Sequence, residues 1–286
     1  MLLADAMRSE GYRLLRNRMT VFWSVLFVPI GFVIGGLLYH LMTKSRGDEM
    51  AAQANIPMTA STEPVNLAEA LSMGTDYSAN GAILAFMLIA AATVYAGDYR
   101  WETWRLTSAR NTRLNLLLGK VGVMKLTAVA ASFLFIVSAL VFGVSQAMVF
   151  QRPIGFELAG DEAGRMALTW LLGYVRIVQY GLVALLTAVV TRSLLAALFV
   201  PIALGFGQSI FGQMLPLLAW TPDMWAPQLL LPGLAFDTLK AAVTPNPMMP
   251  LADGQWIKAL VGLALWCVIP LVAALAWFRR QDLSKE

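Results

Sequence analysis

The sequence predicts an all-α polytopic membrane protein, and three observations lead to this fold class. Of its 286 residues, 58% are hydrophobic and only 13% are charged, whereas a soluble domain carries about 25% charged residues. The mean hydropathy is +0.66. The apolar residues form six long runs, and a hydrocarbon core ~30 Å thick needs about 20 apolar residues per helix. Each run should be helical, because a backbone in lipid must satisfy its own hydrogen bonds.

The six runs predict the order of the elements within one transmembrane domain, residues 1–286. The third run is longer than a bilayer requires, so its helix should tilt or project into water. Asn80 is expected to cap the second helix, because asparagine is a preferred N-cap residue. The expected spans are residues 21–41, 80–97, 118–144, 167–190, 194–212 and 257–278.

The distribution of basic residues predicts that both termini are cytoplasmic. With the N-terminus inside, 14 of the 21 Lys and Arg residues fall in inner segments and five in outer loops, which is the positive-inside bias. A bacterial-type inner (cytoplasmic) membrane is the expected location. The inner residues are Arg8, Arg13, Arg16, Arg18, Arg100, Arg105, Arg110, Arg113, Lys120, Lys125, Arg192, Arg279, Arg280 and Lys285; the outer ones are Lys44, Arg46, Arg152, Arg165 and Lys240.

Residues 1–20 are predicted to form an amphipathic helix that lies on the inner membrane surface. The helix either serves as a simple anchor or also contacts a cytoplasmic partner, for which Arg13 and Arg16 are the candidates. Its apolar face would hold Leu3, Met7, Gly11, Leu14 and Leu15, and its opposite face Asp5, Ser9, Arg13 and Arg16.

Two expected outer loops are too long to be turns. Residues 42–79 are polar and acidic, and should be partly helical. Residues 213–256 are apolar but hold seven of the 13 prolines. A chain broken by proline cannot cross lipid, because its backbone groups would stay unpaired. This segment is therefore expected to be re-entrant: short helices that dip into the outer leaflet or cap a cavity.

The absence of several motifs excludes some classes of site and of function. The chain has one Cys and one His, which excludes an internal disulfide, a cysteine metal cluster and a two-histidine haem site. It has no phosphate-binding loop of the G-x-x-x-x-G-K-[ST] type and no hydrolase motif. We therefore expect no catalytic residue, no metal site and no cofactor in this chain.

The inner segment 98–113 is dense in cations. A short helix parallel to the membrane would present its arginines to an aqueous partner. Trp101 and Trp104 would anchor at the interface or fill a partner's groove. The alternative is an ordinary positive-inside loop with interfacial tryptophans. The cations of the segment are Arg100, Arg105, Arg110 and Arg113.

Four sequence features together resemble one family. An acidic residue, Arg, Thr, Arg, a further Arg and a Leu-rich run ending in Lys fall on Asp98, Arg100, Thr103, Arg105, Arg113 and Lys120. Residues 10–18 form a basic stretch before the first span. Residues 277–283 read Trp-Phe-Arg-Arg-Gln-Asp-Leu, and a Leu-Pro-Gly lies at 231–233. Because these features follow one another along a chain with six expected spans, the chain resembles the type-2 ABC transporter permeases. These are the exporter-like transmembrane subunits of ATP-binding cassette transporters. Trp104 departs from the pattern, in which a smaller aliphatic residue is expected.

The resemblance implies a transport subunit rather than an enzyme. A second copy, or a similar permease, would complete a twelve-span unit. Two separate P-loop ATPase subunits would bind ATP and Mg²⁺ and drive export of an amphiphilic or hydrophobic substrate: a peptide, an antibiotic or a lipid-like molecule. Membrane lipid is the other expected partner, and nucleic acid is not one. Residues 98–113 would be the coupling helix in an ATPase groove, with residues 2–18 beside it. The residues of the coupling helix that contact the ATPase would be Asp98, Arg100, Trp101, Thr103, Trp104, Arg105, Arg110 and Arg113.

Polar side chains within the spans mark a candidate substrate path, because such side chains usually face a bundle interior. Arg176, Gln179 and Tyr180 form a polar patch in the fourth span, and Gln208 lies in the fifth. Alternatively, Arg176 extends its head to the outer headgroups and Gln208 makes lateral hydrogen bonds.

Small residues in the first and fifth spans suggest close helix approach. Gly31 and Gly35 lie in the first span and Gly205 in the fifth. The family resemblance implies a dimer interface between these spans. Ordinary packing within one chain explains the glycines equally well.

Three alternatives to an exporter remain at this stage. A copper-linked permease would use the outer methionines, since thioethers suit Cu(I). A membrane anchor or sensor would recruit an ATPase without transport. A secondary transporter would need an intramembrane acidic relay, which the spans lack. The outer methionines are Met214, Met224, Met248 and Met249.

Overall fold

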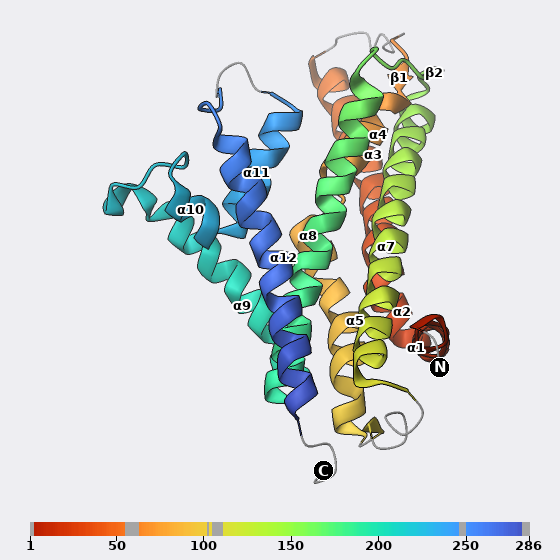
Figure 1. Ribbon diagram of the computed structural model, residues 1–286. Helices are drawn as coiled ribbons and strands as arrows, with labels where there is room; N and C mark the ends of the chain where they lie inside the picture. Colours follow the sequence, from red (N-terminus) through yellow and green to blue (C-terminus); the bar gives the residue numbers. More distant parts are fainter. Residues whose placement is uncertain (1–2, 55–62, 102, 105–110, 246–249, 282–286) are drawn as a thin grey trace.

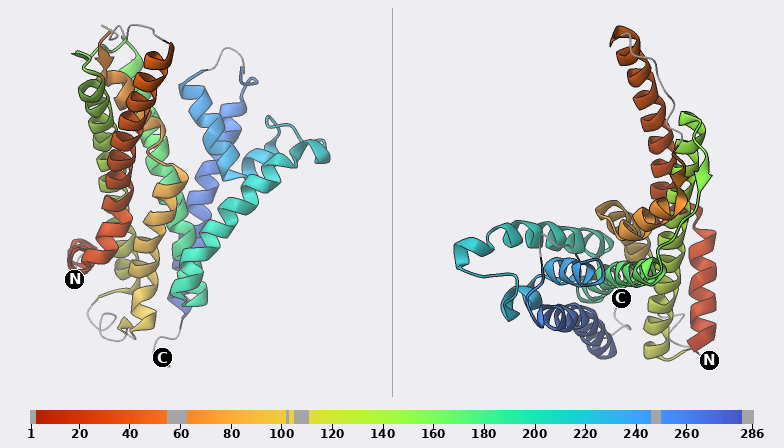
Figure 2. Two further views of the ribbon diagram at one scale, coloured as in Figure 1. Left: turned by 180° about the vertical axis from the view of Figure 1, so that it is seen from behind. Right: turned by 90° about the horizontal axis from the view of Figure 1, so that it is seen from above.

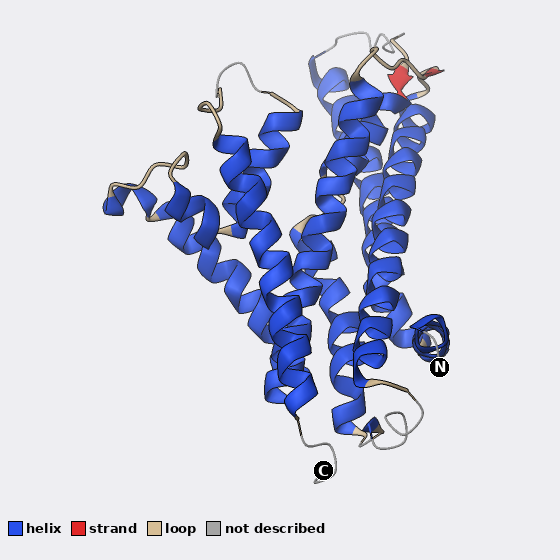
Figure 3. Cartoon of the chain, viewed as in Figure 1, coloured by secondary structure: helices blue, strands red, loops and turns tan. Residues whose placement is uncertain are grey.

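The computed structural model is an all-α membrane bundle with one small two-stranded sheet (Figures 1 and 3). It describes residues 3–54, 63–101, 103–104, 111–245 and 250–281. Six helices are long and apolar enough to cross a membrane, which confirms the predicted fold class. They are Arg18–Met50, Gly81–Arg100, Arg113–Phe150, Glu162–Thr191, Leu194–Gln213 and Gln255–Arg280.

The elements follow one another along the chain as six spans with short helices between them. The first span is composite, because α2 and α3 are joined by a π-helical turn at Phe22–Leu26. A 3-10 turn at Leu215–Leu218 follows the fifth span. The full order is α1 (Leu3–Arg16), α2 (Arg18–Val21), α3 (Phe27–Ala54), β1 (Val65–Asn66), α4 (Leu67–Asp76), α5 (Gly81–Arg100), α7 (Arg113–Phe150), β2 (Ile154–Gly155), α8 (Glu162–Thr191), α9 (Leu194–Gln213), α10 (Trp225–Leu230), α11 (Pro232–Val243) and α12 (Gln255–Arg280).

Side-chain caps fix where the spans begin. The side-chain oxygen of Asn80 accepts a hydrogen bond from the backbone N–H of Ile83, as predicted. Thr112 caps α7 and Ser193 caps α9 in the same way. Each cap satisfies one of the backbone donors that a helix start leaves unpaired.

The helix α8 lies at the centre and joins two groups of helices (Figure 2). On one side it packs against α5, α7 and α4, and α7 in turn contacts α3 and α1. On the other side it packs against α9, α11 and α12. The buried cluster to which both α5 and α8 contribute is rich in alanine, including Ala91 on α5 and Ala184 on α8, and such small residues let helix backbones approach closely.

Two spans are poorly covered by the rest of the chain. Within the most apolar window of each helix, only 17% of residues are buried in the first span and 11% in α9. Away from the end of the bundle that carries both termini, α9 diverges from its neighbours (Figures 1 and 2). In a bilayer these faces meet lipid or another subunit.

The first long loop is partly helical, as expected for residues 42–79. The first-span helix continues to Ala54, well beyond the expected end at residue 41, and α4 follows at Leu67–Asp76. The strands β1 and β2 pair in parallel. Arg152 Nε donates to the carbonyl oxygen of Glu63 at 2.7 Å, so the loops after α3 and α7 are fastened together.

The proline-rich segment forms short helices, as predicted, and the structure packs α10 and α11 beside α12. The α12 side chains Lys258 and Trp266 donate to the carbonyl oxygens of Asp223 and Leu229, at 2.7 and 2.8 Å. These bonds satisfy backbone groups that the breaks between short helices leave open. The segment is thus held against the first half of α12.

Both termini lie at the same end of the bundle (Figure 1), which is called the termini end below. We predict that this end is cytoplasmic. The test uses single-cysteine variants in a Cys267→Ala background. Ala159 lies in the loop before α8 and Thr191 at the end of α8, and both positions are exposed. An impermeant thiol reagent added to intact cells should label Ala159→Cys and spare Thr191→Cys. Labelling of both variants after membrane permeabilisation is the control. The reverse pattern in intact cells would overturn the orientation.

Candidate functional site

The N-terminal helix is packed onto α7 through two glycines. A Cβ at Gly119 would lie 2.8 Å from the Cβ of Ala6, and one at Gly122 would lie 2.6 Å from the terminal methyl of Met7. The glycines therefore let α1 lie directly on the start of the third span. The amphipathic helix predicted for this region is confirmed at Leu3–Arg16.

The expected apolar face of α1 is partly covered by the rest of the chain. Leu14 is buried and Met7 and Gly11 are half-buried, whereas Leu3 and Leu15 are exposed. Ala6 and Glu10 are buried together with Leu14. The buried stripe carries a glutamate that has partners on the neighbouring helices.

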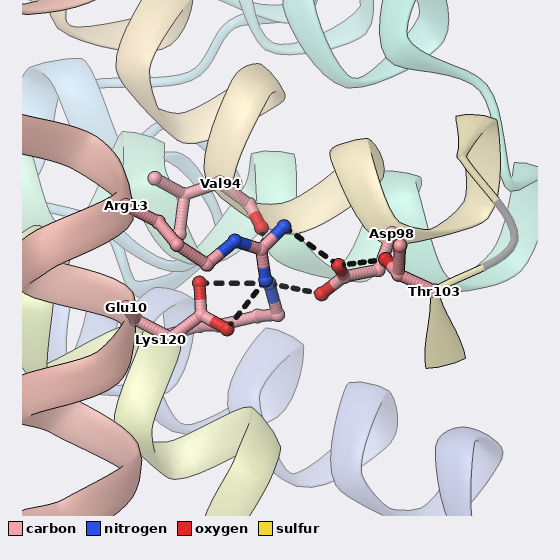
Figure 4. Close-up of polar contacts among 6 residues, drawn as sticks. All are labelled: Glu10, Arg13, Val94, Asp98, Thr103 and Lys120. Atoms are coloured by element: carbon pink, nitrogen blue, oxygen red, sulfur yellow. Dashed lines mark hydrogen bonds and ion pairs between the residues drawn. The ribbon is translucent and has the colours of Figure 1, made fainter. Parts of the chain in front are cut away.

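Four charged side chains meet where α1, α5 and α7 come together (Figure 4). Lys120 Nζ lies 2.6 Å from Asp98 Oδ2 and 3.2 Å from Glu10 Oε2. Arg13 Nη2 lies 2.8 Å from Asp98 Oδ1, and its Nη1 lies 3.0 Å from Glu10 Oε1. We call Glu10, Arg13, Asp98 and Lys120 the charge cluster.

The charge cluster is balanced, and three of its four members are almost fully desolvated, whereas the Arg13 side chain is 42% exposed. The side chains of Asp98 and Lys120 are each 1% exposed. Two further contacts complete their shells: Lys120 Nζ donates to the Val94 carbonyl oxygen at 2.7 Å, and the Thr103 hydroxyl donates to Asp98 Oδ1. Two anions face two cations, so no charge is left uncompensated, which is the condition under which buried ions are tolerated.

The electrostatics of Arg13 follow from this environment. Partial burial of the guanidinium opposes its charge. The hydrogen bond and negative charge of Asp98, together with those of Glu10, outweigh burial and raise the pKa of Arg13. Arg13 therefore stays protonated, and it binds α1 to the end of α5.

The last turn of α5 and the residues that follow it contact the end of α12. The Trp104 ring is 1% exposed, and its centroid lies 4.7 Å from that of Phe278. The Tyr99 hydroxyl donates to Gln281 Oε1 at 2.9 Å. Trp104 is thus a core residue, and the expectation that it meets lipid or a partner's groove is wrong. Its indole fills a space between helices instead.

Arg113 has a structural role at the same place. Its guanidinium donates to the carbonyl oxygens of Phe278, Arg279 and Gln281, which the end of α12 leaves without helical partners. The start of α7 is thereby bound to the end of α12. Arg113 was expected to contact a partner protein, and these bonds occupy it within the chain.

A cleft of about 340 Å³ opens beside the charge cluster, between α1 and α5. Arg13 and Arg16 line one wall, and Trp101 lines the other. The Trp101 side chain is 69% exposed, and the Arg100 guanidinium lies 5.3 Å from its ring centre. We call this feature the inner cleft; it offers cations and an aromatic surface to an aqueous partner.

The structure thus divides the predicted contact residues into two groups. Asp98, Thr103, Trp104 and Arg113 point into the chain, whereas Arg16, Arg100 and Trp101 lie at the surface. Arg105 and Arg110 lie outside the described residues, as do the other positions of 105–110 and residue 102 of the expected coupling helix. Glu10, Lys120 and Gln281 were not predicted as site residues. The spacing of Ala6, Glu10 and Leu14, four residues apart, was the one available signal for Glu10.

A second polar group lies between α8 and α9, near the middle of α8. Arg176 is 7% exposed. Its Nη1 donates to Gln179 Oε1 at 2.7 Å, and its guanidinium lies 4.8 Å from the ring centre of Tyr180. The alternative in which Arg176 reaches the headgroups is therefore wrong. The predicted patch of Arg176, Gln179 and Tyr180 does come together, and both side-chain polar atoms of Gln208 are also buried.

The glycines expected at a dimer interface fall into two classes. A Cβ at Gly205 would lie 2.6 Å from the Tyr180 hydroxyl, so this glycine is used for packing of α9 on α8 within the chain. Gly31 and Gly35 have no neighbour within 4 Å of an added Cβ. Only these two are open to lipid or to a second subunit.

The comparisons assign no family. No protein-family model matches the chain, and no curated protein sequence matches it. Among the described residues, no group of three or more His, Cys, Asp or Glu side chains could hold a metal ion. The functional argument therefore depends on the geometry of the chain itself.

Proposed function

We propose that this chain is the membrane-spanning permease subunit of an ATP-driven exporter, in which separate P-loop ATPase subunits dock at the termini end. The observation that carries the proposal is the charge cluster. It joins the amphipathic helix α1, the start of the cation-rich segment 98–113 and the third span in one desolvated unit.

This arrangement suits the transmission of a displacement from water into the membrane. A partner held in the inner cleft would contact Arg16, Arg100 and Trp101. Because α1 is bound to α5 and α7, and the start of α7 is bound to the end of α12, a push on this surface would move several spans together. ATP would drive the change only if the ATPase binds it with different affinity in the two conformations.

The other features support transport of an amphiphilic or hydrophobic substrate. The described spans are apolar, and two of them have large uncovered faces that a second permease could occupy. An anchor that only recruits an ATPase would not need a buried connection between its aqueous surface and three spans. The resemblance to type-2 ABC transporter permeases implies export as the direction.

Charge reversal in the cation-rich segment should uncouple the ATPase. We expect the double variant Arg105→Glu with Arg110→Glu to insert normally and to lose co-purifying ATPase by about tenfold or more, since 1.4 kcal/mol of interface free energy is tenfold in affinity. The measurement is stoichiometry by mass after purification of the tagged chain from its native membrane in mild detergent.

The matched control reverses two arginines at the same end, in Arg279→Glu with Arg280→Glu. Their side chains are exposed on the last turn of α12, and the contact of Arg113 with Arg279 uses the backbone carbonyl oxygen rather than the side chain. This control should retain the ATPase. A wild-type chain that yields no P-loop ATPase would overturn the proposal, and equal loss in both double variants would overturn the docking surface.

A further inference from the structure

We propose that the polar group between α8 and α9 and the groove beside it form a binding site for a single-chain anionic amphiphile, such as a long-chain carboxylate. The inference rests on the proposed function, since it names the substrate class of the exporter. It assigns the charged head to Arg176 and Gln208, and the hydrocarbon tail to the groove.

The first step is the charge of Arg176. It is buried near the middle of α8, and it is bonded only to neutral groups. Besides Gln179, its Nη2 lies 3.5 Å from the Tyr180 hydroxyl, and its guanidinium lies over the Phe236 ring. No carboxylate of the described residues lies within ion-pair distance, although the charge of Asp237 on α11 acts on Arg176. A buried cation without an anion is costly unless a ligand supplies one.

The second step is the amide of Gln208. Its Nε2 and Oε1 are both buried, and neither has a hydrogen-bond partner among the described residues. Buried polar atoms in native proteins are almost always paired. A Cβ at Gly233 would lie 3.2 Å from Arg176 Nη2 and 3.9 Å from Gln208 Oε1. The two side chains therefore converge on the same glycine of α11, where a carboxylate could bond to both.

The third step is the groove, which has a volume of about 350 Å³. Its walls are mainly apolar, with Leu84 and Leu88 on α5 and Ile202 and Phe206 on α9. Tyr180 also lines it and so connects the groove to Arg176. The volume is near the low end of the roughly 300–1,000 Å³ of ligand sites, which favours one hydrocarbon chain over two.

The position of the groove fits a ligand that arrives from the bilayer. It lies between α5 and α9, where α9 diverges from the bundle (Figures 1 and 2). The α9 helix has few buried residues, so lipid surrounds its outer face. An amphiphile could enter sideways with its head at the depth of Arg176.

The test measures oleate binding to the purified chain in neutral detergent, by native mass spectrometry at alkaline pH, where the carboxylate is ionised. We expect saturable binding of oleate and at least tenfold weaker binding of oleyl alcohol, which has the same chain and no charge, because a charge-assisted hydrogen bond contributes about 1.5–3 kcal/mol. Dioleoyl phosphatidylglycerol tests the two-chain alternative and should also bind more weakly.

Three variants and one control test where the ligand binds. Arg176→Gln should weaken oleate binding about tenfold, and Arg176→Lys should restore most of it. Arg165→Gln is the matched control, because Arg165 lies on the same helix in an exposed pair with Asp161, and it should bind like the wild type. Ala85→Phe places a ring in the groove and should weaken binding of the tail.

Gln208→Leu separates a binding role from a structural one. Removal of two unpartnered polar atoms should leave the melting temperature unchanged or raised, while oleate binding falls. Equal binding of oleate and oleyl alcohol, or unchanged oleate binding in both Arg176→Gln and Gln208→Leu, would overturn the site. Neither result depends on an ATPase, so failure of this site and failure of the proposed function are distinguishable.

Discussion

Replacement of Asp98 by Asn is expected to lower the free energy of unfolding by about 3–5 kcal/mol, the range for removal of one partner from a buried ion pair. The substitution keeps the shape of the side chain and removes its charge. Lys120, which is 1% exposed, would then share Glu10 with Arg13. The charge cluster would carry one uncompensated positive charge in a desolvated place.

Lys120→Met should be similarly destabilising, because it leaves the cluster with one excess negative charge. The double variant, Asp98→Asn with Lys120→Met, restores the balance through Glu10 and Arg13. We therefore expect it to lose less stability than the sum of the two single variants, with a coupling energy at the upper end of the usual ~0.5–3 kcal/mol. The measurement is the thermal unfolding midpoint in detergent, followed by tryptophan fluorescence.

The control for this cycle is Asp161→Asn, which breaks the exposed pair between Asp161 and Arg165 at the opposite end of the bundle. Their side chains are 77% and 41% exposed, and exposed pairs contribute about 0–1 kcal/mol. Its midpoint should be close to that of the wild type. Additive effects in the Asp98 and Lys120 cycle would show that the two residues do not form the pair described here.

Gly262→Ala is expected to displace the proline-rich segment from α12. An added Cβ would lie 2.1 Å from the carbonyl oxygen of Gln228 in α10, so a backbone segment must move. Gln228 is fully buried, and its Nε2 bonds to the Pro222 carbonyl oxygen and the Thr238 hydroxyl, at 2.7 and 2.9 Å. Displacement of α10 strains these bonds as well, and overpacking costs about 1–3 kcal/mol on its own.

The matched control is Gly207→Ala on α9. No atom lies within 4 Å of a Cβ added at Gly207, and Ala is favoured over Gly within a helix by about 0.5–1 kcal/mol. The two substitutions should therefore shift the thermal midpoint in opposite directions. A Gly262→Ala protein as stable as the wild type would show that α10 does not lie against α12 as described.

Gly262→Ala should also reach the site proposed for the amphiphile. The segment that α12 holds continues into α11, and its Gly233 abuts Arg176. Movement of α11 would separate Arg176 and Gln208 from their shared neighbour and weaken oleate binding. Gly207→Ala should leave that affinity unchanged.

The sequence alone predicted the features that depend on local composition. Hydropathy located the six spans, because a run of about 20 apolar residues is sufficient to cross the bilayer core. Asn80 was recognisable as a cap, since its bond to the Ile83 N–H closes within four residues. Proline spacing predicted the short helices of residues 213–256, because proline interrupts a helix wherever it lies. The distribution of basic residues predicted that both termini lie on the same side of the membrane.

Only the tertiary structure decided which way the polar side chains point. A helix that is apolar all round carries no periodic signal for its inward face, so the sequence left two alternatives open for the direction of Arg176 and for the packing of Gly205. Glu10, Asp98 and Lys120 lie far apart in the sequence, and each alone resembles a solvated charge. Their pairing arises because Gly119 lets α1 approach α7 closely. The sequence therefore located the six spans and the cation-rich segment, while contacts between distant helices decided where charge could be buried.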